Sequence, residues 1–199
     1  MNSGIEAVAA TDAKKNLRRQ MLARRDALTK EERARASLLM TERILGHQWF
    51  YRSEYFLGFV SYGSEIDTKP LLEEAIRQGK KVYVPKVEGE QMVFYRICSL
   101  EELIKGYKGI PEPVGDTEIF DYAVCQKKGE TDKVLLLMPG VAFDPYRNRI
   151  GYGKGFYDRY LAEREELTLR SIAVGFRCQM VDEVPAESYD KRPYQVICV

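Results

Sequence analysis

The residues between positions 149 and 158 combine glycines, two basic side chains and one carboxylate, which are the residue types of phosphate-binding loops. They are Arg149, Gly151, Gly153, Lys154, Gly155 and Asp158. Glycine lets backbone N–H groups turn toward a ligand and approach it closely. Lys154 and Arg149 add full positive charges, and Asp158 could hold a metal ion near the same phosphates. The stretch therefore predicts a phosphate site.

Two common glycine motifs do not fit this stretch. A Walker A loop needs Gly-Lys-Ser/Thr after a four-residue gap, whereas Lys154 is followed by Gly155. The dinucleotide motif GxGxxG fails because Phe156 stands in the place of its last glycine. Glycines are also common in tight turns, so a purely structural turn is the alternative interpretation.

A second candidate phosphate contact lies near the N-terminus. Residues 13–28 predict a basic amphipathic helix in which Lys14 and Arg18 lie one turn apart and can reach one anionic ligand. A solvated surface helix explains the same pattern. Residues 1–12 are expected to form a flexible tail, and residues 13–199 a single domain.

Apolar runs predict the strands that position these residues. Strands are expected over residues 55–60, 81–85, 91–97, 134–138, 171–176 and 196–199. The strand at 134–138 is expected to be central and to deliver the glycine-rich loop. Helices alternate with these strands, so we expect an open, mostly parallel, Rossmann-like α/β sheet flanked by helices.

The helix boundaries follow from capping signals. A capping box at Thr29 and Glu32 starts a helix that ends near Gly46. A helix over residues 69–78 is expected after Asp67 or Thr68, and another from Gly153 or Gly155 to Glu166. Ser99 and Glu102 suggest a second capping box, with a short helix over residues 100–105.

A carboxylate in the loop after the first strand is a further candidate. Ligands of parallel α/β sheets bind beyond the carboxyl ends of the strands. Glu65 lies at such a place, after the strand at residues 55–60. An isolated loop glutamate is also commonly just solvated.

Composition excludes several function classes. The 199-residue chain has a net charge of +1, so it has no basic field for nucleic acid. No apolar run approaches a membrane span, and the N-terminus does not resemble a signal peptide. The four cysteines form no CxxC pair, which favours reduced thiols in a cytoplasmic protein. The only histidine, His47, lies outside the candidate stretches, so a Ser-His or Cys-His nucleophile is poorly supported.

The stretch MPGVAFDPYRNRIGYGKGFYDRYL closely resembles the signature of 5-formyltetrahydrofolate cyclo-ligases, also called methenyltetrahydrofolate synthetases. KKNLRRQMLARR, EIDTKPLL and VPAESYD agree at compatible spacing. The resemblance implies conversion of 5-formyltetrahydrofolate, with or without a polyglutamate tail, to 5,10-methenyltetrahydrofolate, with ATP and Mg²⁺. It also implies a fold shared with sugar-phosphate isomerases and CoA transferases, in a protein expected to be a monomer.

The resemblance also assigns residues. The ATP contacts that it implies are Lys14, Lys15, Asn16, Leu17, Arg18, Arg149, Ile150, Gly151, Tyr152, Gly153, Lys154, Gly155, Phe156 and Tyr157. The folate contacts that it implies are Val60, Glu65, Tyr152, Gly153, Lys154, Gly155 and Phe156. Lys154 and Arg149 are the catalytic candidates, with Lys154 nearest the transferred phosphate. Asp158 and Asp190 match the magnesium-associated aspartates.

Two departures from the family pattern are visible. Many relatives have Tyr-Tyr-Asp where this chain has Phe156, Tyr157 and Asp158, and many bacterial relatives have His before the aspartate where this chain has Tyr189. The role of position 189 is therefore open. Two other functions also stay open: an inactive regulator that binds folate or nucleotide, and a sugar-phosphate isomerase.

Overall fold

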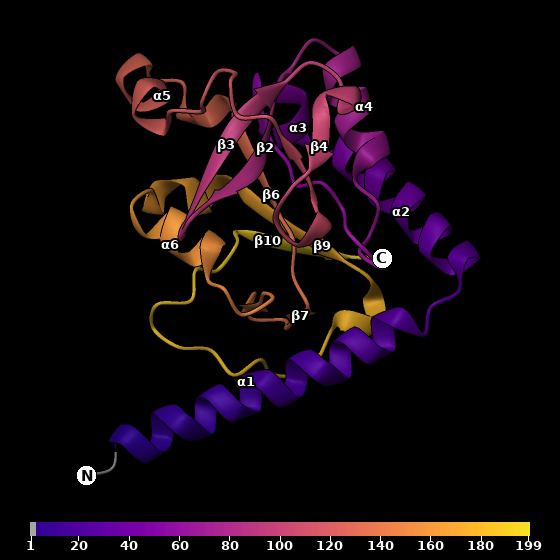
Figure 1. The fold of residues 1–199 in the computed structure, drawn as a ribbon, viewed down its shortest axis with the longest axis vertical. Coiled ribbons are helices and arrows are strands. Elements are labelled where there is room, and N and C mark those ends of the chain that lie inside the picture. The colour runs from indigo at the N-terminus through magenta and orange to yellow at the C-terminus, as the bar shows by residue number, and fades with distance from the viewer. Residues whose placement is uncertain (1–2) are drawn as a thin grey trace.

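The computed structural model describes residues 3–199, with side chains from residue 12 onward. Its centre is a six-stranded sheet in the order β10-β9-β6-β1-β2-β3 (Figure 1). The strands are β1 (Tyr55–Leu57), β2 (Lys81–Glu88), β3 (Gln91–Ile97), β6 (Val134–Met138), β9 (Ser171–Gly175) and β10 (Gln195–Cys198). All neighbours are parallel except the β2–β3 hairpin, so the prediction of an open, mostly parallel sheet is confirmed.

Two hydrophobic layers cover the two faces of this sheet. Leu135 and Leu137 of β6 pack into one layer, and Leu136 packs into the other, because successive strand residues point to opposite faces. All five residues of β6 are buried, as expected for a central strand covered on both faces.

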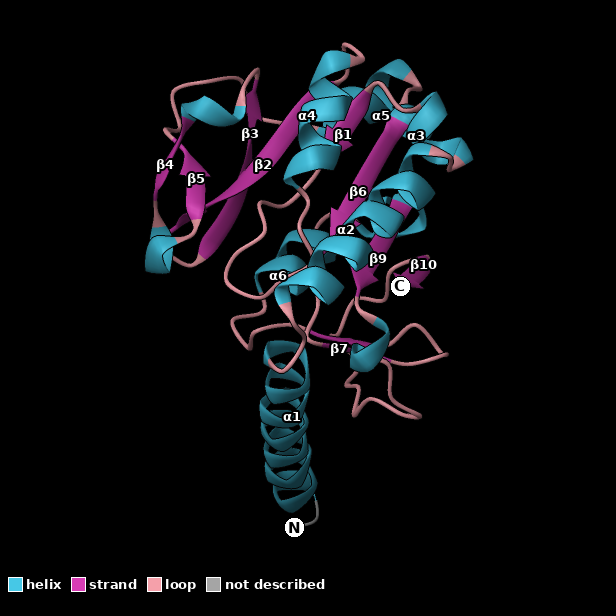
Figure 2. Cartoon of the chain, turned by 90° about the vertical axis from the view of Figure 1, so that its right-hand side faces the viewer, coloured by secondary structure: helices cyan, strands magenta, loops and turns pink. Residues whose placement is uncertain are grey.

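Each layer is completed by helices. On one face lie α2 (Lys30–Leu45), α3 (Gln48–Arg52) and α4 (Lys69–Arg77); Figure 2 shows α2 and α4 in front of the strands. On the other face lie α5 (Tyr122–Lys128) and α6 (Phe156–Ala162). None of the helices in residues 3–199 has the length and apolarity that crossing a membrane requires.

One of the two predicted capping boxes is confirmed. At the start of α2, the Glu32 amide donates to the Thr29 hydroxyl, and the Thr29 amide donates to the Glu32 carboxylate. The second prediction is wrong, because Glu102 accepts from the Cys98 amide instead of that of Ser99. Only a 3-10 turn, Leu100–Glu102, forms there. The chain then enters β4 (Leu103–Lys105), which pairs with β5 (Pro111–Pro113), and we call residues 103–113 the β4–β5 arm.

Helix α1 (Ser3–Asp26) begins earlier than the expected start at Ala13. Residues 1 and 2 lie outside the described residues, and residues 3–12 form the first part of α1. That segment holds three alanines and no proline, so nothing in it prevents the helix from starting before Ala13. Helix α1 runs along one end of the fold, with its N-terminal end beyond the body (Figures 1 and 2). The division of the chain into a tail and one domain stays a prediction.

The central strand β6 leads into the glycine-rich loop, as predicted, but not immediately. A small hairpin intervenes, formed by β7 (Ala142–Phe143) and β8 (Arg149–Ile150). The following α6 also ends at Ala162, well before Glu166, and a 3-10 turn, Glu165–Arg170, leads to β9. Further 3-10 turns are Tyr107–Gly109, Thr131–Lys133 and Arg177–Gln179.

Candidate active site

A cavity of about 310 Å³ lies beyond the carboxyl ends of β1 and β6. Its walls come from the segments after these strands, from β2 and β3, from the β4–β5 arm and from the glycine-rich loop. The lining includes Val60, Glu65, Pro139, Arg149, Gly151, Tyr152, Lys154, Gly155, Phe156, Tyr157 and Asp158. The sheet therefore brings most of the predicted site residues to one place, where ligands of parallel α/β sheets bind.

The glycine-rich loop is held against α1 by Arg18. The Arg18 Nε donates to the Gly151 carbonyl at 2.8 Å. A Cβ atom at Gly153 would lie 3.2 Å from the Arg18 Cζ, and Gly153 has a φ of +95°. Both the backbone conformation and the packing of Arg18 therefore favour glycine at position 153.

Lys154 lies at the tip of this loop. Its side chain is exposed at the edge of the cavity, and no ion pair within residues 12–199 involves it. Its carbonyl accepts a hydrogen bond from Arg159 Nη1 at 2.7 Å, which fixes the loop backbone. The ammonium group is thus available to a ligand in the cavity.

Arg149 is buried, with a side chain only 3% exposed, and it bridges two parts of the site. Its Nη2 atom lies 3.1 Å from Asp158 Oδ1, and its Nη1 donates to the Pro139 carbonyl at 3.2 Å. Its Nε and the hydroxyl of Tyr157 are both buried without a partner in residues 12–199. Burial raises the pKa of Tyr157, so this hydroxyl stays protonated. Arg149 and Tyr157 line the cavity, and each therefore keeps one buried polar atom without a partner next to it.

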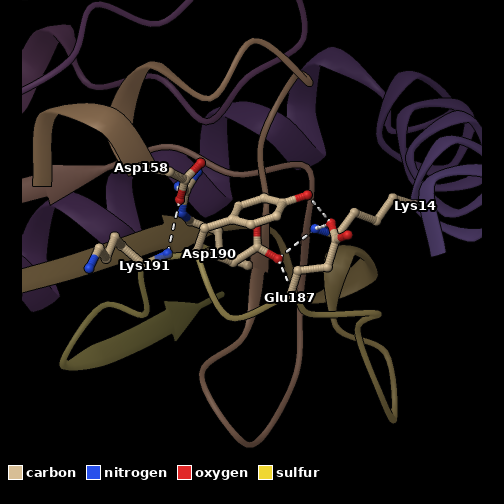
Figure 3. Close-up of polar contacts among 7 residues, drawn as sticks. Lys14, Asp158, Glu187, Asp190 and Lys191 are labelled. Atoms are coloured by element: carbon tan, nitrogen blue, oxygen red, sulfur yellow. Dashed lines mark hydrogen bonds and ion pairs between the residues drawn. The ribbon is translucent and has the colours of Figure 1, made fainter. Parts of the chain in front are cut away.

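Lys14 contacts the second predicted metal aspartate directly (Figure 3). Its Nζ lies 2.5 Å from Asp190 Oδ2 and 2.5 Å from Glu187 Oε2. Burial lowers the pKa of Lys14, but the hydrogen bonds and charges of Asp190 and Glu187 outweigh this effect and raise it. The hydrogen bonds of Lys14 and Tyr189 lower the pKa of Glu187. Lys14 is thus a charged group held by two carboxylates.

Tyr189, whose role the sequence left open, belongs to the same cluster. Its hydroxyl donates to Glu187 Oε2, the oxygen that also contacts Lys14. The next segment of the chain reaches the Arg149 pair, because the Lys191 amide donates to Asp158 Oδ1 at 3.0 Å. Asp158 and Asp190 are therefore neighbours in space (Figure 3).

Glu65 also lines the cavity, in the loop between β1 and α4. Its Oε1 accepts from the Tyr152 hydroxyl at 2.7 Å, and its Oε2 accepts from the Tyr62 amide at 2.8 Å. Burial raises the pKa of Glu65, and these two hydrogen bonds and the charge of Arg25 oppose the rise. The carboxylate is therefore oriented from two sides.

Comparisons with known proteins identify the family of this chain. The 5-formyltetrahydrofolate cyclo-ligase family profile matches residues 10–199. The chain belongs to this family. The mouse 5-formyltetrahydrofolate cyclo-ligase is 31% identical over 199 residues, covering 96% of both chains. The enzyme of that name from Escherichia coli K12 is 30% identical over 170 residues, covering 84% of this chain and 90% of that one.

Solved structures of methenyltetrahydrofolate synthetases have the same fold. The NMR structure of the Aquifex aeolicus 5,10-methenyltetrahydrofolate synthetase has a TM-score of 0.73 and 30% identity, and the match covers 90% of this chain and 86% of that one. The Mycoplasma pneumoniae synthetase, at 20% identity and a TM-score of 0.69, is similar in fold. The expected likeness to sugar-phosphate isomerases and CoA transferases stays a prediction.

The predicted ATP contacts on α1, residues 14–18, fall into two groups, those that face the site and those that do not. Lys14 and Arg18 face the site, as described above. Lys15 and Asn16 are exposed, and Asn16 accepts only from Arg19 within residues 12–199. Leu17 packs against a hydrophobic cluster that includes the buried Ile150. These two residues therefore support the glycine-rich loop through apolar packing.

The carboxylates of this cyclo-ligase-family site fit a magnesium ion that is shared with phosphates. Within residues 12–199, no three acidic, cysteine or histidine side chains group into a metal cage. Asp158 and Asp190 each use one oxygen for the hydrogen bonds above, while Asp158 Oδ2 and Asp190 Oδ1 make none within those residues. Mg²⁺ in phosphate sites is commonly held by one or two carboxylates and the substrate phosphates, so this arrangement suffices.

Two residues that contact this cyclo-ligase-family site were not singled out from the sequence. Glu187 lies in the VPAESYD stretch, and nothing local indicates its contact with Lys14, 173 residues away. Arg25 is buried beside Tyr152. It follows Leu17 and Met21 at four-residue spacing, so a charged residue on the apolar stripe of the helix was a usable signal.

Proposed function

We propose that the protein converts 5-formyltetrahydrofolate to 5,10-methenyltetrahydrofolate, using ATP and Mg²⁺ and releasing ADP and phosphate. One observation carries the proposal beyond family membership. A single cavity is lined both by the oriented carboxylate of Glu65 and by the glycine-rich loop that carries Lys154, and Glu65 contacts this loop at Tyr152. A folate ring and a triphosphate can therefore meet inside it.

The chemistry needs alignment more than a protein nucleophile. The formyl oxygen attacks the terminal phosphorus of ATP, the bond to the bridging oxygen of ADP breaks, and the formyl oxygen becomes a phosphate ester. The second folate nitrogen, N10, then attacks the formyl carbon, loses its proton, and phosphate departs. Such transfers are accelerated mainly by positioning the two reactants and by stabilising phosphate charge.

Glu65 is proposed to hold the pterin. A carboxylate accepts hydrogen bonds from the amino group and ring N–H of a pterin edge. Glu65 already receives one donor on each oxygen, so its orientation is set, and each oxygen has a further lone pair for the ligand. Val60 and Phe156 line the same cavity as apolar walls for the ring.

The glycine-rich loop and α1 are proposed to hold the triphosphate. Lys154 is placed to contact the transferred phosphate, and Arg149 keeps Asp158 in position. Arg18 stabilises the loop, and Lys14 reaches the phosphates by giving up its carboxylate partners. Asp158 and Asp190 would hold Mg²⁺, which supplies neutralisation of phosphate charge.

The deciding experiment is an activity assay of the purified protein. Incubation with 5-formyltetrahydrofolate and Mg-ATP should produce the absorbance of methenyltetrahydrofolate. Turnover should stop without ATP or with excess chelator. Binding of both ligands without product would indicate the inactive regulator, and nucleotide-independent turnover of a sugar phosphate would indicate an isomerase.

The setting of the enzyme is part of the proposal. We propose a cytoplasmic monomer that accepts 5-formyltetrahydrofolate with or without a polyglutamate tail. Cys98, Cys125, Cys178 and Cys198 are all free thiols, in keeping with a reducing compartment. Sedimentation measures the oligomeric state, and competition between mono- and polyglutamylated substrates measures the tail preference.

A further inference from the structure

Arg25 occupies a position that a solvated surface helix does not explain. Although α1 is basic along most of its length, Arg25 is only 5% exposed. Its Nε donates to the Ser64 hydroxyl at 2.9 Å, and its Nη1 donates to the Tyr152 hydroxyl at 2.7 Å. Arg25 therefore links α1 to both sides of the Glu65 wall, through the loop after β1 and through the glycine-rich loop.

The hydrogen bonds around Tyr152 have only one consistent direction. A guanidinium group can donate but cannot accept, so the Tyr152 oxygen must accept from Arg25. The single proton of the tyrosine hydroxyl is then left for Glu65 Oε1, 2.7 Å away. Arg25 thus makes Tyr152 a donor toward Glu65.

We propose that Arg25 is a positioning residue, which acts through Tyr152 to hold the Glu65 carboxylate in the orientation that binds the pterin. The proposal rests on the proposed function, because it takes Glu65 as the group that recognises folate. It gives Tyr152 a role in holding Glu65, besides its place at the cavity wall.

The positive charge of Arg25 has a second effect on the same carboxylate. Burial raises the pKa of Glu65, and the charge of Arg25 and the Tyr152 hydrogen bond both act to lower it. Burial raises the pKa of Tyr157, which also lines the cavity, so its neutral hydroxyl adds no charge near Glu65. Arg25 is therefore the cation that favours the ionised form of Glu65, which is the form that accepts hydrogen bonds from a pterin.

A double-mutant cycle of Arg25 and Glu65 distinguishes positioning of the Glu65 carboxylate from general structural support by Arg25. Calorimetry should measure the dissociation constants of 5-formyltetrahydrofolate and of ATP for Arg25→Met, Glu65→Gln and the double variant. Arg25→Met should weaken folate binding about tenfold, the lower end for a hydrogen bond to a charged group. ATP affinity should change less than twofold. In the Glu65→Gln background, Arg25→Met should have almost no further effect, because its target is already lost.

Two further variants keep the test valid if Arg25→Met folds poorly. Tyr152→Phe removes one oxygen from a half-exposed ring, and it should reproduce most of the folate defect. Arg25→Lys keeps the charge but cannot span Ser64 and Tyr152 together, so it should recover only part of the affinity. Arg24→Met is the matched control, since Arg24 is exposed on the same helix, and it should match the parent protein.

The pH dependence of folate affinity tests the charge of Arg25 separately from its packing, because a loss of packing alone would not shift the pKa of Glu65. Removing Arg25 raises the pKa of Glu65 further, so folate affinity should begin to fall at a higher pH on acidification than in the parent. The shift should be absent in the Glu65→Gln background. Parental folate affinity in Arg25→Met and Tyr152→Phe would overturn the proposal, as would equal losses with and without Glu65. If the parent itself neither binds nor converts 5-formyltetrahydrofolate, the proposed function fails instead.

Discussion

The proposed folate-binding and phosphate-binding regions of the site, which we call its two walls, differ in what holds their charged groups. The folate wall, made of Arg25, Tyr152 and Glu65, is a chain of hydrogen bonds that ends in an oriented carboxylate. The phosphate wall consists of Lys154 and Asp158, which line the cavity, and of Lys14, Arg18 and Asp190 beyond that lining, where Lys14 is neutralised by Glu187 and Asp190. One wall is pre-organised for its ligand, and part of the other must exchange partners.

This difference separates two costs of binding. A pre-organised group loses little conformational freedom when a ligand arrives. A cation that is already paired must give up its partners before it contacts phosphate, and that cost is subtracted from affinity. Lys154 and Arg18 have no ion pair within residues 12–199, and of these two only Lys154 lines the cavity, since Arg18 holds the Gly151 carbonyl. We therefore expect Lys154 to matter for rate and the paired groups to matter for nucleotide affinity.

Lys154→Met should have the largest effect. Negative charge shifts among the phosphate oxygens during transfer, and a fixed ammonium nearby favours the transition state over the ground state. Turnover should fall by roughly two to three orders of magnitude, the scale for removing one electrostatic donor. ATP affinity should fall much less, and Lys154→Arg should recover part of the rate.

The controls for this variant are direct. Lys154 is exposed, so the melting temperature of Lys154→Met should equal that of the parent. Lys127→Met, at an exposed position of α5, should leave turnover unchanged. If a folded Lys154→Met protein keeps parental turnover at saturating ATP, the leading catalytic group becomes Arg149.

Glu65→Gln should have the next largest effect, confined to the folate wall. The amide keeps the shape but loses the charge and one acceptor, and it presents a donor to the Tyr152 hydroxyl. Folate affinity should fall by roughly 10- to 100-fold, corresponding to about 1.5–3 kcal/mol for a charged hydrogen bond. ATP affinity should stay near parental in calorimetry. Equal losses for both ligands would assign Glu65 a general structural role.

The sequence predicted the sheet well because its signals are local. Apolar runs such as residues 134–138 identify buried strands, and the alternation of strands with helices predicts their parallel order. The β7–β8 hairpin was missed because its strands have only two residues each, too short for any periodicity. Leu103–Lys105 was predicted as helix because of the capping-box pattern at Ser99. The pairing of this segment with β5 is a tertiary contact that the local sequence does not show.

The candidate site was predicted only in part, because some of its signals are local and others are contacts between distant residues. The glycine-rich loop and Glu65 are recognisable from residue type and position, and the cavity brings them together. The partners of these groups are distant in sequence. Arg25 meets Tyr152 across 127 residues, and Lys14 meets Asp190 across 176. No local pattern specifies such pairs, so the networks that orient the site became visible only in the folded chain.

A double variant of α1 tests the phosphate wall with a smaller expected effect. Lys14→Ala with Arg18→Ala removes one phosphate contact and the hydrogen bond that holds the glycine-rich loop. ATP affinity should fall about tenfold, near the lower end for losing hydrogen bonds to charged groups, because both side chains are partly solvated. Folate affinity should change little, which sharpens the contrast between the walls.

Two controls isolate the site-facing charges of α1. Arg19→Ala with Arg24→Ala removes the same number of charges from exposed positions of the helix, and it should bind ATP as the parent does. Deleting residues 1–10 should also leave ATP affinity nearly intact. If the Lys14 and Arg18 double variant binds ATP with parental affinity, α1 serves only as a scaffold for this wall.

Glu187→Gln should have the smallest effect on ATP affinity, and the direction of the change is more informative than its size. Glu187 holds Lys14 but is not one of the proposed magnesium aspartates. Its hydrogen bond from Lys14 lowers its pKa, so it is ionised at neutral pH and competes with phosphate for the same ammonium. Removing this charge should tighten ATP binding by about two- to fivefold, the range of a partly exposed ion pair. The gain in ATP affinity should shrink at high ionic strength, because salt screens the competing charge.

Glu183→Gln is the control, because Glu183 is exposed and close to Glu187 in sequence, and this variant should leave ATP affinity unchanged. Weaker ATP binding by Glu187→Gln would mean that Glu187 positions Lys14 for the nucleotide, and the two walls would then be alike in their pre-organisation.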